Sequence, residues 1–269
     1  MLNFVCQDAY TLDDFVRLIS FLRSENGCPW DRVQTHESIR RNFLEEAYEA
    51  CEAIDEHDLV HMREELGDVL MQVLFHADIE REAGHFTIQD VADAACKKLV
   101  SRHPHVFGAR VEKDPDAVLS DWEAIKRQER AQTTTAEAMQ TVSRYLPSLW
   151  RCEKVQSKAA KTGFDWPDAQ TALSKVEEET QELRRAMEQQ NADAVEEELG
   201  DLLFAVVKVA RFQGIDPEAA AHRACEKFIR RFAGVEAEAA KNGQPMESLT
   251  LDEMTALYQR VKEQETHTG

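Results

Sequence analysis

The sequence has few of the features that mark several common protein classes. Aromatic residues make up only 7%, and there are only 10 Gly and 7 Pro among 269 residues. This composition, with 31% charged residues, favours helices and predicts an all-α fold. No apolar run approaches the roughly 18 residues of a membrane span, and the N-terminus lacks a basic segment followed by an apolar one. We therefore expect a cytoplasmic protein with no membrane partner.

Positive charge is also scarce. There are 32 Lys and Arg against 51 Asp and Glu, which gives a net charge of −19. Nucleic acids and anionic membranes are bound through patches of Lys and Arg, so neither is an expected partner. A small phosphorylated ligand carried in with Mg²⁺ remains compatible with this charge.

Motifs of several enzyme classes are missing. The six Cys include no CxxC pair, and the nine His include no HExxH motif, which argues against a zinc site. The absence of GxSxG, GxxxxGK[ST] and GxGxxG argues against a nucleophile elbow, a P-loop and a dinucleotide-binding fold. The carboxylates are therefore the main candidates for chemistry.

One acidic arrangement occurs twice, in the same internal register. Glu49 precedes Glu65 by 16 residues, and Glu182 precedes Glu198 by the same 16. The two copies are Glu45-Glu46-Ala47-Tyr48-Glu49 with Glu64-Glu65-Leu66-Gly67-Asp68, and Glu178-Glu179-Thr180-Gln181-Glu182 with Glu197-Glu198-Leu199-Gly200-Asp201. The repeat predicts two tandem helical-bundle domains, over residues 1–130 and 143–269, joined by a linker over 131–142.

Each acidic element places two carboxylates one helical turn apart. If the two helices of a repeat pack antiparallel, four carboxylates converge. Two like charges ~4 Å apart repel by about 4 kcal/mol at an effective dielectric near 20, so convergence requires a cation. Hard oxygen ligands favour Mg²⁺, with Mn²⁺ as a substitute, over Zn²⁺. The predicted metal ligands are Glu46, Glu49, Glu65 and Asp68, and Glu179, Glu182, Glu198 and Asp201.

The alternative interpretation is a solvated, Glu-rich helix face. Its recurrence in register, with Leu-Gly inside the second element both times, weighs against it. Gly67 and Gly200 each cost ~1 kcal/mol relative to Ala inside a helix. The usual reason for such a Gly is the close approach of a backbone or a ligand.

A Lys and an Arg four residues apart recur after each acidic pair. The two pairs are Lys98 with Arg102, and Lys227 with Arg231. Basic residues at this spacing usually face solvent, but their recurrence beside a metal-type cluster predicts phosphate contacts. Trp30 and Trp166 precede the acidic helices; a core position is the default for both, and a position beside a nucleotide base is the alternative that makes Trp166 a candidate.

Capping signals and periodicity predict the remaining helices. The first begins after Thr11 and ends near Gly27, and Cys28-Pro29-Trp30-Asp31 follows as a turn. Further helices are predicted at about 36–54, 58–82, 87–102 and 116–130, and then at 147–161, 168–190, 193–213, from 216 onward and at 251–265.

With these motifs in order, the sequence resembles the MazG nucleoside triphosphate pyrophosphohydrolases of the all-α NTP pyrophosphatase superfamily. The resemblance covers nearly the whole chain. Besides the acidic elements, it includes Gly27-Cys28-Pro29-Trp30-Asp31, Gln34-Thr35-His36, Arg102-His103-Pro104-His105-Val106-Phe107-Gly108, Lys158-Ala159-Ala160, Gly163-Phe164-Asp165-Trp166, Glu226-Lys227-Phe228 and Arg230-Arg231-Phe232.

The resemblance implies hydrolysis of a nucleoside triphosphate between its α and β phosphates, a Mg²⁺ cofactor and a homodimer. It also implies that the second repeat carries most of the catalysis, with the metal ligands predicted above. Glu178 would support the site or activate water, and Lys227 and Arg231 would contact phosphate. Two departures are Cys225, where relatives often have Asn, and Tyr258, where some have Trp. A regulatory protein that binds Mg-NTP with little turnover is the competing class.

Overall fold

Helices form all the regular structure in the computed structural model, which describes residues 4–108, 114–129 and 134–268. The absence of strands from these residues confirms the all-α prediction. The chain divides into two compact units, Met1–Lys126 and Arg127–Gly269. None of the helices in the described ranges has the length and apolar character needed to cross a membrane.

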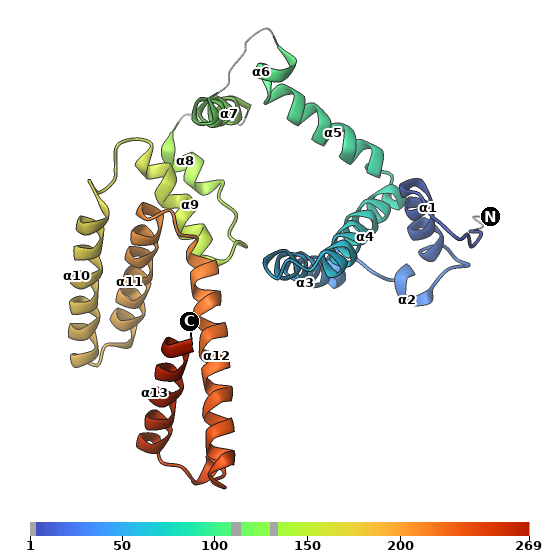
Figure 1. Cartoon of the computed structure of the whole chain (residues 1–269). Helices are drawn as coiled ribbons and strands as arrows, with labels where there is room; N and C mark the ends of the chain where they lie inside the picture. The colour runs from blue at the N-terminus through green and yellow to red at the C-terminus, as the bar shows by residue number, and fades with distance from the viewer. Residues whose placement is uncertain (1–3, 109–113, 130–133, 269) are drawn as a thin grey trace. The chain divides into compact units, whose positions relative to one another are not determined.

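The acidic elements lie in the two longest consecutive helices of the first unit and in their counterparts in the second (Figure 1). The first seven helices are α1 Leu12–Leu22, α2 Pro29–Arg32, α3 His36–Asp55, α4 Leu59–Ala83, α5 Ile88–Ser101, α6 Pro104–Phe107 and α7 Pro115–Glu129. The others are α8 Thr135–Gln140, α9 Ser148–Ala160, α10 Ala169–Glu188, α11 Ala192–Phe212, α12 Pro217–Lys241, the 3₁₀ helix η1 Met246–Ser248 and α13 Leu251–Thr268.

Each acidic pair of helices forms an antiparallel hairpin closed by the same short turn. In the first unit, His57 has a φ of 58° and Asp58 caps α4 by accepting hydrogen bonds from the Val60 and His61 N–H groups. In the second, Gln190 has a φ of 54° and Asn191 caps α11. Because the turns match, the register between facing helices is the same in both hairpins.

Local side-chain chemistry explains where most helices begin and end. Thr11, Thr35 and Thr87 each form a capping box, which satisfies N–H groups that the first turn leaves unpaired. Asp216 caps α12, whose first residue is Pro217. Gly84 ends α4 with a φ of 77°, in the left-handed region that suits glycine.

The structure differs from the prediction at the end of the first helix and in three segments that were predicted as a turn, a helix break and a linker. Helix α1 ends at Leu22 rather than near Gly27, because the chain folds back and the Cys28 N–H donates to the Leu22 carbonyl at 2.7 Å. A Cβ at Gly27 would lie 2.2 Å from that carbonyl oxygen, so the turn requires glycine. Residues 29–32 and 104–107 form short helices, and residues 135–140 of the predicted linker form α8.

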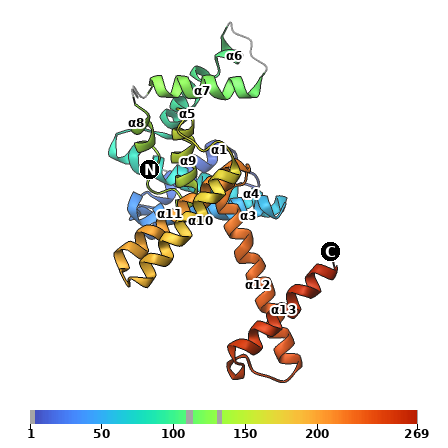
Figure 2. The same ribbon diagram turned by 90° about the vertical axis from the view of Figure 1, so that its left-hand side faces the viewer.

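Separate apolar cores hold each unit together. In the first, Ile19 of α1, Ile39 of α3, and Leu74 and Phe75 of α4 are buried against one another. In the second, α12 and α13 form a further hairpin, visible in Figure 2, around a core that includes Val235, Leu257 and Val261. Apolar packing away from the carboxylates therefore fixes the first acidic hairpin on α1.

A buried arginine ties the segment before α3 to helix α4. Arg23 is 4% exposed, and its Nε lies 3.2 Å from the Asp78 carboxylate, itself buried. Its Nη2 lies 2.8 Å from Glu82, and its Nη1 donates to the Asp31 carbonyl at 2.9 Å. The Asp31 carbonyl lies in the segment that leads into α3. Arg23 therefore holds the beginning of the acidic helix against α4.

The second unit makes the equivalent attachment with the charges reversed. Arg211 of α11, which corresponds to Asp78 in the repeat, donates to both carboxylate oxygens of Asp165 at 2.6 Å. Asp165 lies in the segment that leads into α10. The Lys208 ammonium lies 5.4 Å from the ring centroid of the neighbouring Trp166, and the two contacts together hold this segment on α11.

Histidines make a second attachment in the first unit. His36, at the start of α3, lies 2.7 Å from His76 of α4 between their Nδ1 atoms, and 2.6 Å from a Glu80 oxygen through Nε2. Burial, followed by the neighbouring His36, holds the pKa of His76 below its usual value. The N-terminus of α3 is thus fixed on α4 by polar groups as well as by the apolar core.

Candidate metal centre

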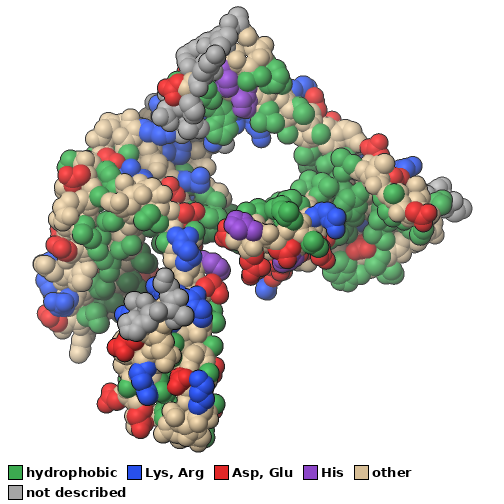
Figure 3. Space-filling model, viewed as in Figure 1, with side chains coloured by type: hydrophobic (Ala, Val, Ile, Leu, Met, Phe, Trp, Pro, Cys, Tyr) green, Lys and Arg blue, Asp and Glu red, His purple; other side chains and the backbone are tan. Residues whose placement is uncertain are grey.

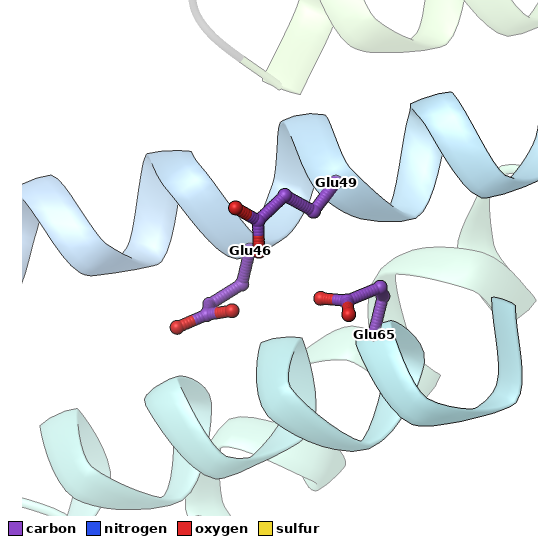
Figure 4. A group of neighbouring side chains, drawn as sticks. All are labelled: Glu46, Glu49 and Glu65. Atoms are coloured by element: carbon purple, nitrogen blue, oxygen red, sulfur yellow. The ribbon is translucent and has the colours of Figure 1, made fainter. Parts of the chain in front are cut away.

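Three carboxylates of the first hairpin converge between α3 and α4. Glu46, Glu49 and Glu65 each offer an oxygen, and these oxygens lie within 4.8 Å of one another. Figure 4 shows Glu46 and Glu49 on one helix and Glu65 reaching toward them from the other. Glu65 is buried, Glu46 half-buried and Glu49 exposed, so the group opens to solvent on one side. We call these residues the N-terminal triad.

The second hairpin repeats this arrangement. Glu179 and Glu182 of α10 and Glu198 of α11 also bring oxygens within 4.8 Å of one another. Glu179 is buried, and the other two are half-buried. We call these residues the C-terminal triad; the structure therefore brings together three of the four predicted carboxylates in each repeat.

The fourth predicted carboxylate lies beside each triad rather than within it. Asp68 is half-buried and Asp201 is exposed. Both act on the triads electrostatically, since Asp68 contributes to the raised pKa of Glu46 and Asp201 to that of Glu198. Glu178 is more exposed than its neighbour Glu179 and forms the rim of the C-terminal group.

Negatively charged carboxylates lie close together and repel one another in both triads. Burial, followed by the charges of Asp68, Glu49 and Glu65, raises the pKa of Glu46. Partial burial, followed by Glu182, Glu179 and Asp201, raises the pKa of Glu198. In each case the charged form of the carboxylate is disfavoured by loss of solvent and by nearby like charges. A bound cation would offset both effects.

The residues present fit a hard divalent cation. In the described part of the chain, the Glu65 Oε2 atom is buried and has no hydrogen-bond partner. An unpaired buried carboxylate oxygen is costly, and a cation is a suitable partner for it. The three donors of each triad are carboxylate oxygens, which match Mg²⁺ or Mn²⁺ better than Zn²⁺.

Three further residues contact the triads and were not predicted from the sequence. Lys175 places its Nζ 2.7 Å from Glu179 and 2.9 Å from Glu178, and hydrogen bonds to Glu179 and then Glu178 raise its pKa. His61 lies 3.1 Å from Glu65, and Gln72 lowers the pKa of Glu46 against the larger effects of burial and like charges. The i, i+4 spacings of His61 with Glu65 and of Lys175 with Glu179 could have revealed the first two.

The predicted phosphate-binding residues lie on other helices. Lys98 and Lys227 are exposed. Arg231 is held by Glu265 of α13, 2.7 Å from its Nε, and lies over the Tyr258 ring. Arg102 lies 5.9 Å from the Trp122 ring centroid. The structure thus pairs both arginines with residues outside the triads.

The glycines inside the acidic helices do not pack closely within the chain. A Cβ at Gly67 or Gly200 would lie more than 4 Å from every described atom outside its chain neighbours and the adjacent backbone of its own helix. Of the two usual reasons for such a glycine, the close approach of a backbone is therefore not found among the described residues. A ligand remains the other reason for them.

Comparison with known proteins places both hairpins in one family. The model of the MazG nucleotide pyrophosphohydrolase domain matches residues 34–107 and 168–235, which include both triads and both Lys and Arg pairs. The chain is 41% identical, over 93% of its length and 95% of the relative's, to the nucleoside triphosphate pyrophosphohydrolase/pyrophosphatase MazG of Thermotoga maritima.

The chain belongs to the MazG family. A second relative, the nucleoside triphosphate pyrophosphohydrolase of Escherichia coli K12, is 42% identical over 94% of this chain and 98% of its own length. The alignments cover almost all of each protein, and the family model matches this MazG chain twice. The family resemblance predicted from the motifs is confirmed.

Proposed function

We propose that this protein is a Mg²⁺-dependent nucleoside triphosphate pyrophosphohydrolase that cleaves ribo- or deoxyribonucleotides between the α and β phosphates. The observation that carries the proposal is the pair of carboxylate triads at the same place in two hairpins that the MazG domain model matches. The relatives' names describe the same class of activity. Products would be the nucleoside monophosphate and pyrophosphate.

We assign the following roles to residues of the second repeat. Glu179, Glu182 and Glu198 would hold the cation, with Asp201 beside them. When bound, the cation supplies charge neutralisation for the triphosphate and polarises its phosphoryl oxygens. Glu178, on the rim, would accept the proton of a water that attacks the α phosphorus.

Groups on α12 would serve the leaving pyrophosphate. Lys227 and Arg231 offer positive charge to its developing negative charge. Arg231 is held by Glu265 and by stacking over Tyr258, so its guanidinium is oriented before a nucleotide arrives. Trp166, 40% exposed, would lie beside the base. In the first repeat, Lys98 and Arg102 are the corresponding phosphate-binding candidates.

Separation of products tests this function. With Mg²⁺, we expect nucleoside monophosphate and pyrophosphate in equal amounts, and excess EDTA should abolish turnover because like-charged carboxylates no longer have a cation between them. Mn²⁺ should restore part of the activity. Nucleoside diphosphate and phosphate would identify a different hydrolase, and Mg-NTP binding with negligible turnover would identify a regulatory protein. Full activity in EDTA would contradict the metal role.

We also propose a homodimer. Helix α12 exposes Phe228, Ile229 and Phe232, and Figure 3 shows hydrophobic side chains at the surface of both units. Exposed apolar groups of this size are commonly covered by a partner, and a second copy is the partner that the family implies. Light scattering at micromolar concentration should give twice the mass of 30.7 kDa. A monomer mass under these conditions would contradict the proposal.

A further inference from the structure

The C-terminal triad already has a positive charge against it. Lys175 lies one turn before Glu179 on α10, and its ammonium lies 2.7 Å from Glu179 Oε1 and 2.9 Å from Glu178 Oε1. The Glu179 side chain is 8% exposed and that of Lys175 is 32% exposed. The ammonium therefore occupies the solvent side of a carboxylate that is otherwise buried.

The N-terminal triad lacks this arrangement. The position that corresponds to Lys175 is Asn42, which has no charge. Here His61 lies against one oxygen of Glu65, and the other oxygen is buried without a partner in the described structure. The two triads have equivalent carboxylates, but a lysine contacts the C-terminal triad and a histidine contacts the N-terminal triad.

We propose that Lys175 is a resident counter-ion that competes with a divalent cation for the C-terminal triad. This inference rests on the metal site of the proposed function. Lys175 and a cation would share the Glu179 carboxylate, and two positive charges so close repel each other. The cation must therefore displace the ammonium, whose partly exposed, flexible side chain can move into solvent.

The consequence is an unequal affinity of the two triads for metal alone. The N-terminal triad offers an unpaired oxygen, whereas the C-terminal triad must first release Lys175. Metal without nucleotide thus fills the N-terminal triad at lower concentration. Lys175 is not a metal ligand; it determines how readily the C-terminal triad binds metal.

Mn²⁺ binding to the full-length chain tests this difference. The electron paramagnetic resonance signal of free Mn²⁺ gives the dissociation constant without any nucleotide or turnover. Glu65→Gln weakens the N-terminal triad and isolates the C-terminal one, and Glu198→Gln does the reverse. In the Glu65→Gln chain, Lys175→Met should tighten Mn²⁺ binding at least ~10-fold, because an ammonium a few ångströms from the metal is removed.

Two further variants control for unrelated effects on the fold. Lys175→Arg retains the charge and should keep the weak binding of the parent site. Asn42→Lys in the Glu198→Gln chain places an ammonium one turn before Glu46 and should weaken Mn²⁺ binding at the N-terminal triad at least ~10-fold. Unchanged helical circular dichroism would show that each variant is folded.

The outcomes separate the inference from the proposed function. If Mn²⁺ binds both triads but Lys175→Met leaves the affinity unchanged or weakens it, the counter-ion role is wrong and the metal site stands. If the parent chain binds no Mn²⁺ at either triad, the metal site and the inference both fail. Tighter binding in Lys175→Met together with weaker binding in Asn42→Lys supports the counter-ion.

Discussion

Replacement of Glu198 by Gln is expected to reduce kcat at least ~100-fold, equivalent to about 2.7 kcal/mol of activation free energy. Glu198 supplies one of the three converging oxygens of the C-terminal triad, and its amide analogue keeps the shape but removes the charge that holds a cation. The expectation that the second repeat carries turnover comes from the family resemblance. Initial rates of pyrophosphate release at saturating Mg²⁺ provide the measurement.

Glu65→Gln is the matched control, because Glu65 occupies the same position in the N-terminal triad. It should leave the rate within a few-fold of the parent, since removing a charge from one triad leaves the carboxylates of the other intact. Similar partial losses in the two variants would show two independent active sites. A severe loss from Glu65→Gln alone would reverse the assignment.

Replacement of Arg23 by Met is expected to destabilise the first unit by about 3 kcal/mol, at the low end for a broken buried ion pair. The variant leaves the buried Asp78 without its Nε contact and leaves the Asp31 carbonyl without its donor. Ser20 and Arg81 still contact Asp78, which limits the loss. Hydrogen exchange of peptides from α4, with α11 as an internal reference, measures the change.

Arg41→Met controls for the loss of an arginine as such. Arg41 makes an ion pair of 2.8 Å with Glu45, but its side chain is 86% exposed. Solvent screens such a pair, so the variant should cost less than about 1 kcal/mol. Equal loss of protection in the two variants would mean that burial of the Arg23 network contributes little.

The hairpins could be predicted from the sequence because their determinants are local. Thr35 and Asp58 mark the beginnings of α3 and α4, and Gly84 marks an end through backbone conformation alone. The recurrence of two acidic elements in register then predicted which carboxylates meet. Short helices such as α6 and α8 lack enough turns to show a periodic pattern, so periodicity does not predict them.

The surroundings of the triads were harder to predict because they depend on which side of each helix is buried. Leu66 is 51% exposed whereas the neighbouring Glu65 is buried, the reverse of what their polarity alone predicts. The pairing of Arg231 with Glu265 joins residues on different helices and depends on how α13 returns along α12. Such contacts follow from tertiary packing, which spacing along one helix does not contain.

In the first unit an arginine of the leading segment contacts an aspartate of α4, and in the second an aspartate of the leading segment contacts an arginine of α11. This reversal of charge affects how a duplicated chain folds. Two similar hairpins in one polypeptide can exchange segments and become trapped in a misassembled state. If the segment before α10 were to dock on α4, Asp165 would meet Asp78, and docking of Arg23 on α11 would bring it to Arg211. Either exchange buries two like charges, so each hairpin selects its own leading segment.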